Sequence, residues 1–127
     1  MYNYKLLVVG FAAVAILFAG CTGGAPGKYD EFAKCLTSKG AKMYGAFWCP
    51  HCKNTKDAFG TSFKYVTYIE CSTPDGNSQI DVCKAAGIQG YPTWDFAGGH
   101  REAGELSLDD LSAYSGCAVS PSTAAAK

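Results

Sequence analysis

The strongest chemical signal in the sequence is a pair of cysteines, Cys49 and Cys52, separated by two residues. Pro50 lies between them and favours the first turn of a helix, where a missing N–H group costs nothing because that turn leaves its N–H groups unpartnered. Residues 41–47, just before the pair, are apolar and aromatic, as in a buried strand. The pair is therefore expected where a strand gives way to a helix.

This position predicts thiol chemistry. At a helix N-terminus, free N–H groups and the helix dipole stabilise negative charge, so Cys49 should lose its proton more easily than a free cysteine and act as the nucleophile. Cys52, three residues on, is within disulfide reach but more shielded, and we expect it to resolve mixed disulfides. His51 is expected to help stabilise the thiolate, with a solvated side chain or a metal ligand as the alternatives.

Composition limits the other classes of function. The CxxC spacing also occurs in zinc ribbons, which usually need a second such pair, and the chain has none. We therefore expect no metal and no cofactor. Eleven basic residues balance eleven acidic ones, and the sequence lacks the basic cluster of a nucleic-acid-binding protein, so no nucleic acid is expected as a partner.

Seven cysteines in 127 residues are typical of a chain that matures in an oxidising compartment. Residues 1–21 contain Lys5, an apolar run and then Cys21, and we interpret them as a lipoprotein-type signal with Cys21 as the lipidation candidate. An uncleaved membrane anchor and cleavage with release are the alternatives, although the apolar run is shorter than the roughly 20 residues of a spanning helix. We expect an extracytoplasmic protein, in the periplasm or at the cell surface, tethered to the membrane by its N-terminus.

Four further cysteines are expected to form structural disulfides. Cys71 and Cys83 flank a turn cluster at residues 74–77, and we pair them; we also pair Cys35 and Cys117, which fall in the first and last predicted helices. Six cysteines permit fifteen connectivities, so the sequence alone does not fix this choice. A second redox pair formed by Cys71 and Cys83 is the functional alternative.

Apolar spacing and glycine punctuation predict eight elements in the order αβαβαββα. Helices are expected at residues 28–39, 50–59, 78–86 and between Ser107 and Gly116, and strands at 41–47, 63–71, 93–97 and 100–103, with Ser78 and Ser107 as N-caps. The expected fold is α/β, a four-stranded mixed sheet flanked by helices on both faces. One domain would span residues 28–117, between a flexible linker at 22–27 and a disordered tail at 118–127.

Two motifs together, FWCPHC after an apolar strand and GYPT some forty residues later, resemble the thioredoxin superfamily over residues 29–117. The resemblance implies a thioredoxin-like fold in which the bond before Pro92 is cis and faces the cysteine pair. It also implies that the backbone before this proline binds the substrate chain, and Tyr91 is expected to line that groove. Met43 stands where thioredoxins carry a buried acidic residue that assists the resolving thiol, so proton handling at Cys52 is expected to differ.

The two tryptophans are expected to play different parts. Trp48 directly precedes the nucleophile, and we expect it to cover the site and contact substrate. Trp94 falls in a predicted strand and is expected in the core.

A closer resemblance is to the thioredoxin-like domains associated with bacterial homologues of vitamin K epoxide reductase, carried by the segments KCLTSKGAKMYGAFWCPHC, ECSTPDG, GIQGYPTW and GELSLDDL. It implies a thiol-disulfide oxidoreductase that donates disulfides to secreted protein thiols and is reoxidised by a quinone-linked membrane partner. The Pro-His pair between the cysteines is similar to that of oxidising periplasmic donors and favours this direction. A membrane-tethered reductase or isomerase, and a metal-binding thioredoxin-like chaperone, are the alternatives.

Overall fold

The computed structural model describes residues 25–121. The predicted signal or anchor at 1–21, including Cys21, lies outside the described residues, as do residues 22–24 of the predicted linker and 122–127 of the predicted tail. Between residues 25 and 121, no helix has the length and apolar character needed to cross a membrane.

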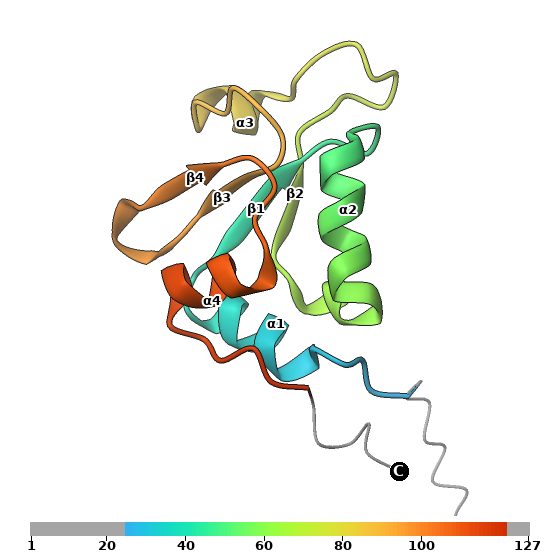
Figure 1. Ribbon diagram of the computed structural model, residues 1–127. Coiled ribbons are helices and arrows are strands. Elements are labelled where there is room, and N and C mark those ends of the chain that lie inside the picture. The colour runs from blue at the N-terminus through green and yellow to red at the C-terminus, as the bar shows by residue number, and fades with distance from the viewer. Residues whose placement is uncertain (1–24, 122–127) are drawn as a thin grey trace, which may run out of the picture.

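The elements follow the predicted order and form one mixed sheet (Figure 1). They are α1 (Asp30–Ser38), β1 (Lys42–Gly45), α2 (Pro50–Phe59), the 3₁₀ segment η1 (Gly60–Tyr65), β2 (Tyr68–Glu70), α3 (Asp81–Ala85), β3 (Thr93–Asp95), the 3₁₀ turn η2 (Ala97–Gly99), β4 (Arg101–Ala103) and α4 (Leu108–Ser115). The strand order is β2-β1-β3-β4; β1 and β2 are parallel, and the other two pairs are antiparallel. The predicted four-stranded α/β fold is confirmed.

The larger core cluster joins three helices to one face of the sheet. Met43 of β1 and its cross-strand partner Trp94 of β3 are fully buried. They belong to one cluster with Phe32 of α1, Phe59 of α2 and Leu111 of α4. The cluster also contains both thiols of the predicted site, so the same apolar contacts that stabilise the fold hold α2 against β1.

The opposite face carries a smaller cluster. Side chains alternate along a strand, so Tyr44 points away from Met43, and it packs with Cys71, Cys83 and Ile88. Cys71 and Cys83 are disulfide-bonded, which joins the residue after β2 to α3. Helices therefore flank both faces of the sheet.

A second disulfide, Cys35–Cys117, links α1 to the residue after the α4 cap, across 82 positions of the sequence. Both bonds are the pairings that the sequence analysis favoured. Among residues 25–121, this leaves Cys49 and Cys52 as the free thiols.

The predicted strand at 63–71 is wrong in its first half. Residues 60–65 form η1, and only Tyr68–Glu70 pair with β1. Phe63 and Tyr65 pack against the main core cluster from this 3₁₀ segment. The aromatic residues of this segment are therefore partly buried from a 3₁₀ helix, although aromatic composition of this kind is typical of a strand.

The predicted cap Ser78 is also wrong, because α3 begins at Asp81 with Ile80 as its N-cap residue. The loop before it runs longer than expected. The carboxylate of Asp75 accepts hydrogen bonds from Thr73 and from Asn77, and Ser72 forms an isolated bridge with Gln79. By contrast, Ser107 caps α4 as predicted, in a capping box with Asp110.

The limits of the predicted linker and tail need a small correction. Gly27, placed in the linker, is buried, and its amide donates a hydrogen bond to the carboxylate of Asp30 at 2.9 Å. Val119, placed in the tail, packs against the main core cluster. The packed part of the chain thus extends slightly beyond residues 28–117 at both ends.

Candidate active site

The free thiols lie at the start of α2, directly after the loop that leaves β1. Cys49 is the N-cap residue with an extended backbone, and Pro50 is in the first turn of the helix, as the sequence predicts. Cys52 is 1% exposed and Cys49 is 6% exposed. The two thiols therefore differ in access as expected, with Cys52 the more shielded.

Burial has a direct effect on Cys52. It raises the pKa of this thiol to about 12; the nearby Cys49 side chain acts in the same direction, and a backbone contact at Ala46 partly offsets the effect. At neutral pH Cys52 is therefore a neutral thiol. Since only a thiolate attacks a disulfide, Cys52 has to lose a proton before it can react.

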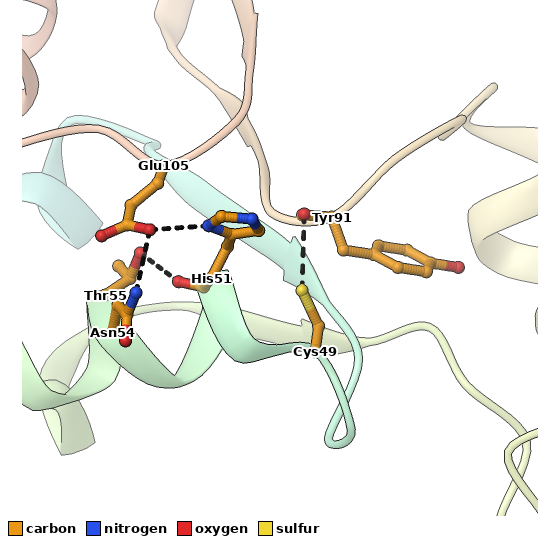
Figure 2. Close-up of polar contacts among 6 residues, drawn as sticks. All are labelled: Cys49, His51, Asn54, Thr55, Tyr91 and Glu105. Atoms are coloured by element: carbon orange, nitrogen blue, oxygen red, sulfur yellow. Dashed lines mark hydrogen bonds and ion pairs between the residues drawn. The ribbon is translucent and has the colours of Figure 1, made fainter.

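Cys49 faces the loop before β3 (Figure 2). The Tyr91–Pro92 peptide bond is cis, and Pro92 is fully buried. The thiol of Cys49 donates a hydrogen bond to the carbonyl oxygen of Tyr91 over 3.5 Å. A thiol pair at a helix start thus faces a cis-proline at the start of the neighbouring antiparallel strand.

The fold is thioredoxin-like. No family model matches the sequence. The chain is similar to the thiol-disulfide oxidoreductase LTO1 of Arabidopsis thaliana, with 43% identity over 89 residues, which make up 66% of this chain and 23% of the relative. The chain therefore spans about a quarter of that relative's length. Together with the mixed sheet and its helices, this similarity fits the thioredoxin-like superfamily.

His51 points toward a carboxylate that follows β4. Its Nδ1 atom lies 2.9 Å from Oε2 of Glu105, and the side-chain amide of Asn54 donates a hydrogen bond to the same oxygen over 3.2 Å (Figure 2). The hydrogen bond from His51, and then that from Asn54, lower the pKa of Glu105. When His51 is protonated, Glu105 therefore holds a positive charge on the first turn of α2, close to Cys49.

Aromatic side chains flank Cys49. Trp48 is 52% exposed, its ring packs edge-on against Tyr91 with 5.9 Å between centroids, and its indole N–H donates a hydrogen bond to the hydroxyl of Ser72. Phe47 is also exposed. Tyr91 is held in turn by a hydrogen bond between its hydroxyl and Gln79. These rings form an exposed apolar surface beside Cys49.

A glutamate organises the loop before the nucleophile. Oε1 of Glu70 accepts hydrogen bonds from the backbone amides of Phe47 at 3.1 Å and Ser72 at 3.0 Å. Its other oxygen accepts a hydrogen bond from the hydroxyl of Tyr68 at 2.8 Å. The loop that presents Cys49 is therefore tied to the end of β2.

Four residues at the site were not predicted from the sequence: Tyr68, Glu70, Asn54 and Glu105. Glu70 could have been found, because it ends the strand that runs parallel to β1, and the carboxyl ends of neighbouring parallel strands meet at one edge of the sheet. Glu105 gave no such signal, since it lies 54 positions from its partner His51.

The metal-ligand alternative for His51 finds no cluster to support it. Within residues 25–121, no three side chains of metal-binding type gather in one place. The Nδ1 atom of His51 interacts with Glu105.

Proposed function

We propose that this domain catalyses thiol-disulfide exchange, with Cys49 as the sulfur that bonds to substrate and Cys52 as its internal partner. The observation that carries this proposal is the thiol pair at the start of α2, with Cys49 hydrogen-bonded to the carbonyl before cis-Pro92. The name and 43% identity of the plant relative support it.

Donation of a disulfide takes two steps. A substrate thiolate attacks Cys49 Sγ, the Cys49–Cys52 bond breaks, and Cys52 leaves and is protonated. A second substrate thiolate then attacks the substrate sulfur bonded to Cys49, so that a substrate disulfide forms and Cys49 leaves as a thiolate. Two electrons pass from the substrate to the cysteine pair.

We further propose that the direction is donation of disulfides to secreted protein thiols outside the cytoplasm. Two disulfides in addition to the thiol pair support an oxidising compartment. The resemblance of the motifs to domains associated with vitamin K epoxide reductase homologues supports reoxidation by a quinone-linked membrane partner. A tether at residues 1–21, by lipidation of Cys21 or by an uncleaved anchor, would hold the domain near that partner. A reductase or isomerase with the same thiol pair is the second candidate.

The reduction potential of Cys49 and Cys52 tests the direction. We expect a value of roughly −120 to −180 mV when the full chain is equilibrated with a glutathione redox series and each cysteine is followed by peptide mass. A value near about −270 mV would instead assign a reductase. Failure of the two thiols to form a disulfide at any poise would refute thiol-disulfide exchange itself.

The ion pair of His51 and Glu105 should tune this potential. A positive charge beside Cys49 stabilises the thiolate of the reduced form, which makes the disulfide more oxidising. We therefore expect His51→Ala to make the potential more negative by tens of millivolts, and Glu105→Gln to shift it the same way by less.

A matched control is available in the hairpin, where His100 and Glu102 form an ion pair over 3.0 Å. His100→Ala and Glu102→Gln should leave the potential of the cysteine pair unchanged. Equal shifts in the two sets of variants would show that the effect is one of net charge and does not depend on the place of His51.

A further inference from the structure

When the reduced pair is reoxidised, Cys49 first forms a mixed disulfide with the oxidant, and Cys52 then attacks Cys49 to close the internal bond. This closing step, the reverse of the bond opening in donation, requires a proton acceptor for Cys52. Cys52 is 1% exposed, so bulk water has little access to it. Its raised pKa means that the thiolate is rare at neutral pH. A base inside the domain would remove this limit, provided that the domain carries out the proposed exchange.

Gly45 lies against both the thiol of Cys52 and the hydroxyl group of Tyr68. A β-carbon added to Gly45 would be 3.0 Å from Cys52 Sγ, 3.0 Å from the hydroxyl oxygen of Tyr68 and 2.7 Å from the ring of Tyr68. The Cys52 sulfur and the Tyr68 hydroxyl oxygen therefore lie on the same side of Gly45. The distance between these two atoms is at most twice 3.0 Å. A side chain at position 45 would therefore crowd both groups.

The Tyr68 hydroxyl is already joined to a carboxylate. It donates a hydrogen bond to Oε2 of Glu70 at 2.8 Å. Burial, and next this hydrogen bond, raise the pKa of Tyr68 above its usual range. Tyr68 therefore keeps its proton at neutral pH. It can pass this proton to Glu70 only if its oxygen accepts another proton at the same time.

The other charged and titratable groups around Cys52 complete the setting. On α2 these are Cys49 and Lys56, whose electrostatic effects on Cys52 oppose each other. The ammonium group of Lys56 lies 3.9 Å from the centre of the Tyr68 ring. On the β2 side, the hydroxyl of Tyr68 and the carboxylate of Glu70 supply oxygens able to accept a proton.

We propose that Tyr68 and Glu70 form the proton path that ionises Cys52 in the resolving step. The Cys52 proton moves to the Tyr68 oxygen as the Tyr68 proton moves to Oε2 of Glu70. The Cys52 thiolate then attacks Cys49 Sγ, the Cys49–Cys52 bond forms, and the bound thiol leaves as a thiolate. Glu70, now protonated, returns its proton to that thiolate or to solvent.

Glutathione disulfide provides a test in which the two steps are observed separately. The reduced full chain carrying Cys21→Ser, so that Cys49 and Cys52 are the free thiols, is mixed with glutathione disulfide, quenched with acid at short times and weighed by mass spectrometry. Cys49 first forms a mixed disulfide and releases one glutathione. Cys52 then displaces the second glutathione and closes the internal disulfide.

Tyr68→Phe and Glu70→Gln are each expected to slow the second step on the order of 10- to 100-fold at pH 7 and to leave the first step unchanged. The mixed disulfide should therefore accumulate. The difference from wild type should narrow as pH rises, because hydroxide then takes the proton from Cys52. A purely structural role for the two residues would not produce this pH profile.

Tyr65→Phe and Glu31→Gln are the matched controls; Tyr65 precedes β2 at its other end, and Glu31 forms a surface ion pair with Lys34. Both should behave as wild type. An unchanged second step in either Tyr68→Phe or Glu70→Gln would overturn the path, as would equal slowing of both steps, which indicates a displaced loop before Cys49. If the chain with intact Tyr68 and Glu70 forms neither the mixed nor the internal disulfide, the proposed function fails as well.

Discussion

Cys52→Ser is expected to leave the domain linked to its clients through stable mixed disulfides at Cys49. In this variant Cys49 forms the mixed disulfide by attacking a client disulfide, which releases one client thiolate, and the site at the start of α2 beside Tyr91 still allows that attack. The serine cannot displace the bound client, so the adduct persists unless a client thiolate opens it. Cys49→Ser is expected to lower the exchange rate by at least about 10³-fold, the scale of removing a nucleophile. Non-reducing gels of cells that express each variant, followed by mass spectrometry of the adducts, measure both effects.

The two variants serve as controls for each other. Cys52 is 1% exposed with a raised pKa, whereas Cys49 is 6% exposed, so adducts should appear with Cys52→Ser and vanish with Cys49→Ser. If both variants gave the same adducts, the clients would be bonded to another cysteine, and the assignment of Cys49 as nucleophile would be wrong. The identity of the trapped proteins would show whether the clients are secreted chains.

Loss of the Cys35–Cys117 bond is expected to have the largest effect on stability. The bond spans 82 positions, and closing a loop of that length restricts the unfolded chain by about 4.5 kcal/mol in the chain-entropy model. For a domain of this size, the double variant Cys35→Ala/Cys117→Ala should therefore melt roughly 20 °C lower. Urea unfolding of the reduced-site protein, followed by circular dichroism, measures the change in the free energy of unfolding.

The second disulfide supplies the comparison. Cys71 and Cys83 are 12 positions apart, so Cys71→Ala/Cys83→Ala should cost less, about 3 kcal/mol. In both double variants, Cys49 should still form the mixed disulfide first and Cys52 should still close the internal disulfide. If removing Cys71–Cys83 lowered the free energy of unfolding more than removing Cys35–Cys117, the entropic explanation would be contradicted. Packing around α3 would then account for the difference.

Much of the fold followed from local chemistry that marks where elements begin and end. Pro50 at the start and Gly60 at the end give α2 the bounds that the sequence predicts, and Gly60 has the positive φ of 57° that ends the helix. Ser107 and Gly116 likewise mark α4. Local rules succeed here because caps act within a single turn of helix.

The errors arose where the chain's path depends on distant contacts. Phe63 packs against Phe59 and Tyr68 from a 3₁₀ segment, and aromatic residues buried in this way look like a strand in the sequence. Ser78 had the right residue type for a cap, but the loop around Asp75 delays α3.

The candidate site likewise has a local part that could be predicted from the sequence and a part that depends on distant contacts. Cys49 and Cys52 could be predicted because their spacing and the following helix are local. The partner of His51 could not, because Glu105 approaches from the segment after β4, 54 positions away. Glu70 lies at the end of β2, where the pairing of β2 with β1 brings it to the site. Sequence spacing thus identifies the reacting atoms, whereas the groups that adjust their charge appear only in the folded protein.

The unequal exposure of the two tryptophans gives this protein a pair of built-in optical reporters. Trp48 is 52% exposed beside Cys49, whereas Trp94 is 0% exposed in the core. A soluble quencher such as acrylamide should therefore suppress emission from Trp48 and spare Trp94 until the domain unfolds. One fluorescence experiment can follow the redox state through the first ring and the integrity of the core through the second.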